Sequence, residues 1–266
     1  MITARDHMIA PAIRAEIETR LRTISTDEDV RILLAVESGS RAWGFPSPDS
    51  DYDIRFVYVR RRDWYLQLRP ARDVIERPID DEIDLNGWDI RKALGLLLKS
   101  NAVISEWIES PIRYCADHAA VARLRALADD VLDARAFAHH YASLGGNAAE
   151  RWLEGDDEVA VKKYFYALRP ALVIRCLRLN PASRPPMDLG SLVAAADLPA
   201  HVVDDIAMLV EAKRVTNERS NGARLPQLDA LIRAELARAG DVPGRSIPDA
   251  MALKRANDIF LELVNA

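Results

Sequence analysis

The chain has 266 residues, of which 49 % are hydrophobic and 29 % are charged, and its formal net charge is −5 at pH 7. This composition is that of a globular protein with one large or two small domains, and the acidic balance excludes a protein that coats nucleic acid through general positive charge. Cys115 and Cys176 are far apart in the sequence, so we interpret both as free thiols. The N-terminus lacks a signal-peptide pattern and no apolar run reaches the roughly 18 residues of a membrane span, which predicts a cytoplasmic protein.

A helix and two strands are predicted near the start of the chain. Residues 7–24 carry apolar side chains at helical spacing, and residues 30–36 and 53–59 form strand-like apolar runs. A turn-rich loop joins the two strands, and Trp43 and Phe45 lie within it. We interpret both aromatic residues as packing residues, and the alternative is that they form a wall for a nucleobase.

Two short motifs lie at the two ends of this loop. Asp51 and Asp53 are separated by one residue at the start of the second strand, so their side chains share a face, with Cα atoms about 6.7 Å apart. Two such carboxylates can converge on a pair of divalent metal ions about 3.5–4 Å apart. At the other end of the loop, Gly39 lets a phosphate approach the backbone and Ser40 adds a hydroxyl, and a helix that begins there would direct free N–H groups at the phosphate. The alternative is an ordinary turn and a solvated strand start.

The pattern of Gly-Ser, a gap of about ten residues, and Asp-x-Asp on a strand resembles the nucleotidyltransferase superfamily that includes DNA polymerase beta. Ten residues separate Ser40 from Asp51 in this chain. The string from Gly39 to Gly44 is also similar to the minimal nucleotidyltransferases, except that Trp43 stands where an arginine is common. The resemblance implies an α+β fold whose N-terminal catalytic domain, residues 1–115, has a small mixed sheet flanked by helices. It also implies Mg²⁺ or Mn²⁺ as the cofactor and a nucleoside triphosphate as the substrate.

A third carboxylate is expected on a later strand. Residues 73–77 predict a weak strand and residues 80–85 a further one, in which Asp84 lies between two apolar residues. An acid in that position is costly to bury unless it is paired or bound to a metal. The superfamily commonly has a third carboxylate beside its Asp-x-Asp pair, and we assign this role to Asp84. Asp89 is the alternative, but it directly precedes the helical run 90–99, so we interpret it as a helix N-cap or first-turn residue.

Further strings are similar to one branch of the superfamily, the predicted nucleotidyltransferases that are found alongside RNA ligases and are named for an RNA repair pathway. This second resemblance spans roughly residues 34–230 discontinuously. The strings that carry it are residues 87–92, 99–101, 106–107, 110–112, 162–170 and 185–186.

Helical spacing replaces strand alternation after about residue 115, and glycine and proline residues separate the helical runs. The pattern predicts an all-helical second domain, residues 116–266. Such a domain often closes over the nucleotide in this superfamily, so the resemblance implies that Lys163 and Arg169, together with Arg41, bind the nucleotide. The alternative for the first two is a core helix with basic residues along its edge. We interpret Glu235 as part of a solvated helix face.

These residues together predict a metal-dependent nucleotidyltransferase. Asp51 and Asp53 would bind both metal ions, and Asp84 would bind the ion that activates the attacking hydroxyl. The acceptor hydroxyl could belong to an RNA end, a protein side chain or a small molecule, and the second resemblance favours an RNA end by analogy. Two alternatives from other classes are a catalytically silent regulator that binds nucleotide or RNA, and an antitoxin-like interaction module.

Overall fold

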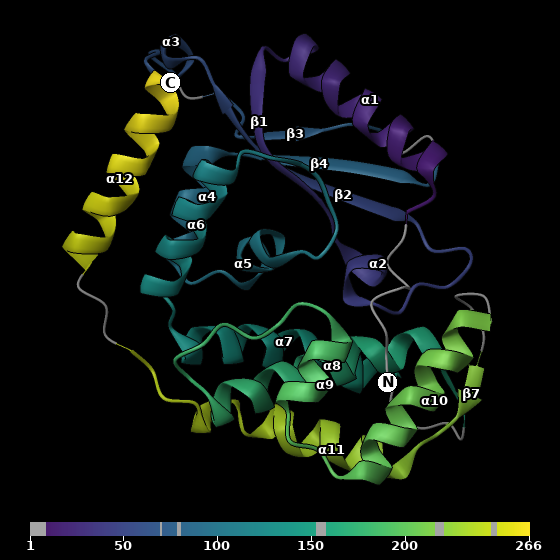
Figure 1. Ribbon diagram of the computed structural model, residues 1–266. Coiled ribbons are helices and arrows are strands. Elements are labelled where there is room, and N and C mark those ends of the chain that lie inside the picture. The colour runs from purple at the N-terminus through teal and green to yellow at the C-terminus, as the bar shows by residue number, and fades with distance from the viewer. Residues whose placement is uncertain (1–8, 70, 79–80, 153–157, 216–220, 246–248) are drawn as a thin grey trace. The chain divides into compact units, whose positions relative to one another are not determined.

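The computed structural model describes residues 9–69, 71–78, 81–152, 158–215, 221–245 and 249–266 (Figure 1). The chain forms two compact units. The sheet unit comprises the described residues of 9–42, 51–131 and 249–266, and the helical unit comprises those of 43–50 and 132–245. Within the described ranges, no helix is both long enough and apolar enough to cross a membrane.

The sheet unit is built on a mixed five-stranded sheet. The strand order is β3-β4-β2-β1-β5, and all neighbouring strands pair antiparallel except β2 and β4, which pair parallel. The strands are β1 (Val30–Glu37), β2 (Tyr52–Arg60), β3 (Val74–Glu76), β4 (Ile83–Asp89) and β5 (Arg113–Ala116). The helices are α1 (Pro11–Asp27), α2 (Gly39–Trp43), α3 (Arg62–Tyr65), α4 (Ile90–Leu97), α5 (Ala102–Glu109), α6 (His118–Asp130) and α12 (Asp249–Asn265).

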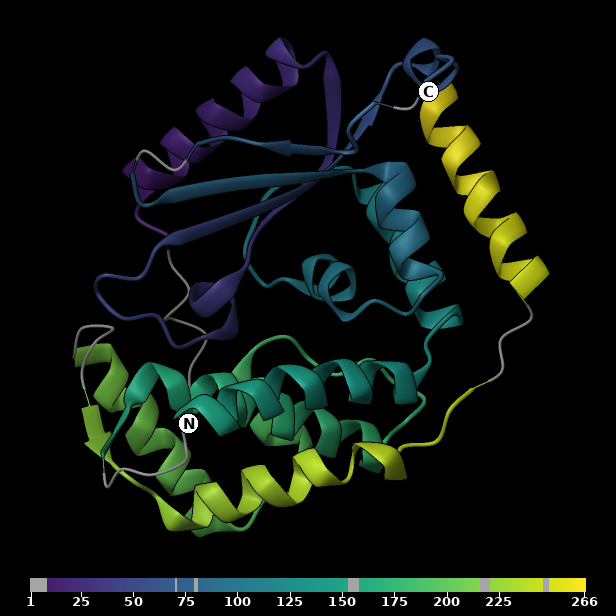
Figure 2. The same ribbon diagram turned by 180° about the vertical axis from the view of Figure 1, so that it is seen from behind.

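Two apolar clusters hold helices against the two faces of this sheet. Ile17, Leu21 and Ile24 of α1 are buried against apolar side chains of the sheet, as the helical spacing predicts. The second cluster joins the other face to α4, α5, α6 and α12. Figures 1 and 2 show α1 alone on its side of the sheet, with α4, α6 and α12 on the opposite side. The sheet is therefore covered on both faces by helices.

Alternation along β2 and β4 leaves part of one face polar. Ile54 and Phe56 of β2 are buried in the α1 cluster, as are Ile83 and Leu85 of β4. The polar residues that alternate with them point to the other face and are half-buried. The polar positions in question are Asp53, Arg55, Asp84 and Asn86.

The helical unit is centred on α8, which contacts α7, α9, α10 and α11. Its elements are α7 (Ala134–Trp152), β6 (Glu158–Ala160), α8 (Val161–Leu179), α9 (Leu189–Ala195), α10 (Ala200–Val215), β7 (Asn221–Ala223), α11 (Pro226–Ala237) and the 3₁₀ helix η2 (Ala239–Asp241). The expectation that Glu235 lies on a solvated face is wrong. Arg175 and Arg178, about one turn apart on α8, enclose its carboxylate, and its side chain is 3 % exposed.

The predicted α+β class, with a mixed sheet followed by a helical region, is confirmed; a short antiparallel ribbon of β6 and β7 is added to the helices. The structure divides the chain at other places than the expected boundary between residues 115 and 116. The sheet unit continues through α6 to residue 131, and α12 returns to it. Residues 43–50 belong to the helical unit. These differences arise because domain membership depends on which apolar faces pack together, not only on helical spacing.

Candidate active site

The backbone between β1 and β2 holds the two sequence motifs together. Glu37 pairs with Ile54 in the antiparallel ladder, and the amide of Ser38 donates to the carbonyl of Asp53 at 2.8 Å. Gly39 has a φ of +57°, and a Cβ at this position would lie 2.0 Å from Oδ2 of Asp53. Only glycine avoids both the left-handed backbone strain and this overlap. Gly39 and the Asp53 carboxylate are therefore directly adjacent.

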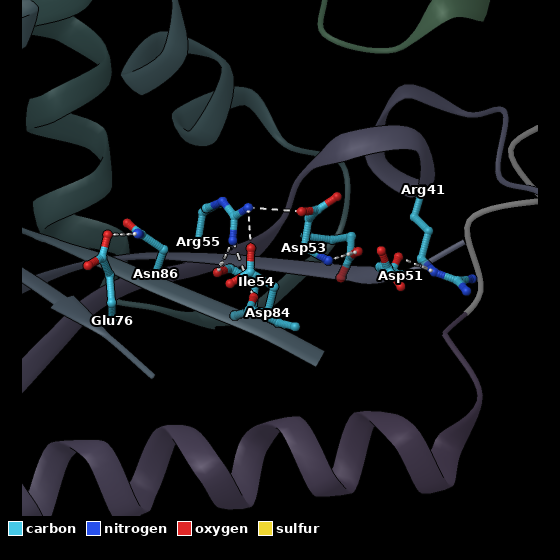
Figure 3. Close-up of polar contacts among 9 residues, drawn as sticks. Arg41, Asp51, Asp53, Ile54, Arg55, Glu76, Asp84 and Asn86 are labelled. Atoms are coloured by element: carbon cyan, nitrogen blue, oxygen red, sulfur yellow. Dashed lines mark hydrogen bonds and ion pairs between the residues drawn. The ribbon is translucent and has the colours of Figure 1, made fainter. Parts of the chain in front are cut away.

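Asp53 and Asp84 are opposite one another on the parallel strands β2 and β4. Nη2 of Arg55, two residues further along β2, donates to Oδ1 of Asp53 and to Oδ2 of Asp84, both at 2.8 Å (Figure 3). The side chains of Asp53, Asp84 and Arg55 remain 32 %, 26 % and 19 % exposed, respectively. The structure thus brings Asp84 beside Asp53, as expected, while its role as a metal ligand stays a prediction.

Asp51 directly precedes β2, and Ser40 and Arg41 belong to the short helix α2. α2 begins at Gly39, so Ser40 is in its first turn, as expected. The backbone carbonyl of Asp51 accepts a hydrogen bond from Nε of Arg41 at 3.1 Å, and the Arg41 guanidinium lies 3.8 Å from the centre of the Tyr52 ring. In Figure 3 this contact is separate from the one that Arg55 makes.

The carboxylates fit a divalent cation in part. Oδ1 of Asp53 and Oδ2 of Asp84 approach the same nitrogen atom, and hard oxygen donors of this kind suit Mg²⁺ and Mn²⁺. Asp51 is exposed. Over the residues that the structure describes, no group of three or more Asp, Glu, His or Cys side chains is placed to hold a metal ion. Asp51 as a member of the ligand set therefore stays a prediction.

Glu37 is a site residue that the sequence analysis missed. It is fully buried at the end of β1, where Oε1 accepts from the amide of Asp53 at 2.9 Å and Oε2 accepts from the Tyr114 hydroxyl at 2.5 Å. Burial raises the pKa of the Glu37 carboxyl to about 7, against the opposing effect of these hydrogen bonds. An acidic residue that closes an apolar strand just before Gly39 was the available signal. Glu37 fixes the backbone from which the Asp53 side chain extends.

Asp89 is the N-cap of α4, which confirms its interpretation as a helix-start residue. Its Oδ1 accepts from the amide of Arg91 and its Oδ2 from the Tyr65 hydroxyl, both at 2.8 Å. The side chain is buried, and this burial raises the pKa of the Asp89 carboxyl. Both carboxylate oxygens are thus used by protein donors that set the start of the helix.

The two basic residues expected to bind the nucleotide lie on α8 of the helical unit. Lys163 is exposed. Arg169 is only 4 % exposed, and its Nε donates to the carbonyl of Met187 at 3.1 Å. The Arg169 guanidinium also lies 4.6 Å from the centre of the Trp43 ring. These contacts give Arg169 a structural role within its unit, and a nucleotide contact by either residue stays a prediction.

The loop residue Phe45 is a packing residue, as interpreted from the sequence. It is 1 % exposed and stacks on Phe165 of α8 with ring centres 4.3 Å apart. Its carbonyl accepts from Nζ of the buried Lys213 at 2.9 Å. Trp43 is half-buried and meets the ring of Tyr166 edge-on. The segment of residues 43–50 is thus anchored to the helical unit by aromatic packing and one buried amine.

A family model matches most of this chain. The family model described as RlaP, RNA repair pathway DNA polymerase beta family, matches residues 13–262. The chain belongs to this family. The polymerase beta resemblance that the Gly-Ser and Asp-x-Asp motifs carry, and the RNA-repair branch within it, are therefore confirmed.

Two individual proteins are also similar to this chain. An uncharacterized protein named YcgL from Bacillus subtilis (strain 168) is 39 % identical over 230 residues, which cover 85 % of this chain and 86 % of that one. A crystal structure of a nucleotidyltransferase-like protein from Exiguobacterium sibiricum 255-15 is 12 % identical with a TM-score of 0.32, and the match covers 94 % of this chain and 80 % of that chain.

Proposed function

We propose that this member of the polymerase beta family is a metal-dependent nucleotidyltransferase. It would transfer a nucleoside monophosphate from a nucleoside triphosphate to a hydroxyl acceptor and release pyrophosphate. The observation that carries this proposal is the convergence of Asp53 and Asp84 on one point, with the Asp53 carboxylate in contact with Gly39. This arrangement supports a site where carboxylates, a cation and a phosphate meet.

Each residue has a definite part in the proposed reaction. Asp53 and Asp84 would hold Mg²⁺ or Mn²⁺, with Asp51 as the expected further ligand. A bound ion of this kind neutralises charge on the phosphates and lowers the pKa of an attacking hydroxyl. The backbone of Gly39 and Ser40 would hold the β- and γ-phosphates, Ser40 would donate its hydroxyl to them, and Asp84 would help to accept the proton of the acceptor hydroxyl.

The acceptor in this proposal is an RNA end. The description of the family as one of an RNA repair pathway supports this choice, by analogy. Because the net charge is −5, contact with RNA would be confined to one local surface. A protein side chain or a small molecule as the acceptor is an outcome that the experiment below distinguishes.

The test is to incubate the protein with each α-labelled nucleoside triphosphate, Mg²⁺ or Mn²⁺, and total RNA, and then to locate the label. We expect label on RNA, and a loss of about 100-fold or more in Asp53→Asn. Asp63→Asn, which changes the same charge on the exposed surface of α3, is the control that should keep full transfer. Label on the protein itself would show that the acceptor is a protein side chain and not an RNA end. If no triphosphate gives transfer, the protein is not an enzyme of this class and the silent regulator is favoured.

A further inference from the structure

Arg55 makes a set of contacts that neither the motifs nor the family description assigns. Its Nη2 donates to one carboxylate oxygen of Asp53 and one of Asp84, each at 2.8 Å. Its Nη1 donates to the backbone carbonyls of Ile54 and Asp84 at 3.1 and 3.2 Å. Arg55 lies on the same face of β2 as Asp53, because the two are separated by one residue. The guanidinium is therefore held by four oxygen atoms that belong to residues of β2 and β4.

Nη2 carries positive charge and lies between two carboxylate oxygens, as a metal cation bound by both would. Two adjacent carboxylates repel each other unless a positive charge lies between them, and here the charge is supplied by the chain itself. The three side chains are only partly buried, so the cluster is accessible from solvent. These three side chains comprise two carboxylates and one guanidinium, and the carboxylate oxygens are the ligand type that divalent cations prefer.

We propose that Arg55 is the resident counter-ion of the Asp53–Asp84 pair and that a divalent metal ion binds there by displacing Nη2. This inference rests on the proposed function in one respect, that the two carboxylates are metal ligands. Displacement costs the two charge-assisted hydrogen bonds of Nη2, so wild-type protein binds the metal more weakly than the carboxylates alone would. Arg55 thus reduces the repulsion between the two carboxylates and holds their spacing when no metal is present.

The first measurement is the Mn²⁺ dissociation constant of each full-length variant by calorimetric titration. We expect Arg55→Gln to bind Mn²⁺ about 5- to 100-fold more tightly than wild type, a range typical of coupled binding equilibria. Arg60→Gln is the matched control, because Arg60 is also a partly buried, ion-paired arginine of β2, and it should leave the constant unchanged. Arg55→Lys keeps the charge without the planar fork, so it should bind Mn²⁺ more tightly than wild type but less tightly than Arg55→Gln.

The second measurement is the melting temperature in the presence of a chelator, which needs no metal and no activity. Arg55→Gln should lower it by a few degrees in the wild-type background. The same substitution should lower it much less when Asp53→Asn and Asp84→Asn are already present, because the carboxylates that Arg55 neutralises are gone. Equal losses in both backgrounds would show that only the backbone carbonyls hold Arg55, and the counter-ion role would be wrong.

The outcomes separate this inference from the proposed function. If wild type and Arg55→Gln bind Mn²⁺ equally, or if Arg55→Gln binds it more weakly, displacement is overturned while the metal site stands. If Arg55→Lys has the same Mn²⁺ dissociation constant as wild type, the positive charge at residue 55 repels the ion without being displaced, and the proposed displacement is wrong. If no variant binds Mn²⁺ at millimolar concentration, both the displacement and the metal-dependent function are overturned.

Discussion

The sheet unit and the helical unit each contain a cluster of carboxylates and guanidinium groups, and the proportions are opposite. In the sheet unit, one Arg55 is shared by Asp53 and Asp84, and these side chains remain partly exposed. In the helical unit, one buried Glu235 accepts from two arginines, Arg175 and Arg178, at 2.9–3.0 Å. The distances are nearly the same, so geometry alone does not separate a site from a structural contact.

Charge balance and exposure make the distinction. In the helical unit, Arg175 and Arg178 donate to both carboxylate oxygens of Glu235, and these contacts join α8 to α11. The cluster of the sheet unit has two carboxylates and one guanidinium, remains partly exposed, and lies beside Gly39, where an added Cβ would overlap the Asp53 carboxylate. We infer that an acid-rich, accessible cluster is the one to examine for ligand binding, whereas a buried cluster with surplus arginine stabilises the fold.

The largest expected effect is the loss of stability when the helical cluster is broken. Glu235→Gln removes the negative charge and leaves Arg175 and Arg178 without their shared carboxylate, so we expect a loss of about 3–5 kcal/mol in the free energy of unfolding. Urea denaturation measures it. Glu211→Gln, in an exposed ion pair with Arg214, should cost less than about 1 kcal/mol. A loss below 1 kcal/mol in Glu235→Gln would remove the contrast between the clusters.

The second effect is a pH dependence of stability that comes from Glu37. Its folded-state pKa of about 7 exceeds the ordinary value of 4.5, so between these pH values the folded protein holds a proton that the unfolded chain has released. Stability should therefore fall as pH rises from 4.5 to 7, by an amount on the order of 3 kcal/mol from this group. Glu37→Gln should flatten that part of the stability curve relative to wild type. Parallel curves for the two proteins would show that Glu37 has no raised pKa.

The third effect concerns the glycine beside the sheet cluster. Gly39→Ala adds a methyl group where Oδ2 of Asp53 lies and forces a positive φ on alanine, so we expect a loss of about 1–2 kcal/mol in stability and a strong loss of transfer. Gly95→Ala is the control in α4, where a Cβ meets no atom within 4 Å. It should raise stability by about 0.5–1 kcal/mol. Equal effects of the two substitutions on transfer would contradict the role of Gly39.

The smallest expected effect is the loss of stability when Asp89, a buried acid of the sheet unit, is replaced. Asp89→Ala removes the N-cap of α4, which should cost about 1 kcal/mol of stability and leave Mn²⁺ binding unchanged. Asp84→Asn should behave in the opposite way, with little loss of stability and a large loss of Mn²⁺ affinity. Calorimetric titration and thermal melting of both variants measure the contrast. If Asp89→Ala loses Mn²⁺ binding while it remains folded, the third carboxylate is Asp89 and the assignment to Asp84 is wrong.

Local patterns in the sequence were sufficient for much of the fold. Apolar spacing predicted the buried side of α1, apolar runs predicted β1 and β2, and the position of Asp89 before an apolar helical run predicted its N-cap. The resemblance to a known family assigned the Gly-Ser and Asp-x-Asp motifs to one candidate site. Each of these features depends on residues that are close in sequence or on a pattern with fixed spacing.

The features that escaped prediction depend on distant partners. Arg55 reads as an ordinary charged residue of an alternating strand, and only the parallel register of β2 with β4 places it between two carboxylates. Glu235 reads as a surface acid until α8 supplies two arginines. The edge strand β5 is only four residues long, too short for its alternation to be recognised. Register and helix packing set these contacts, and a single sequence does not reveal either directly.

The division of the chain has a consequence for dissecting the protein. The path passes from the sheet unit to the helical unit at residues 42–43, returns at 50–51, leaves again at 131–132, and comes back before residue 249. No single cut therefore yields two intact pieces. A fragment that ends at residue 131 would lack Ile259 and Leu263 of its own core, and its loop residue Phe45 would lose the ring of Phe165. Truncation is thus a poor way to assign functions to the two units, and point substitutions in the whole chain are the suitable tool.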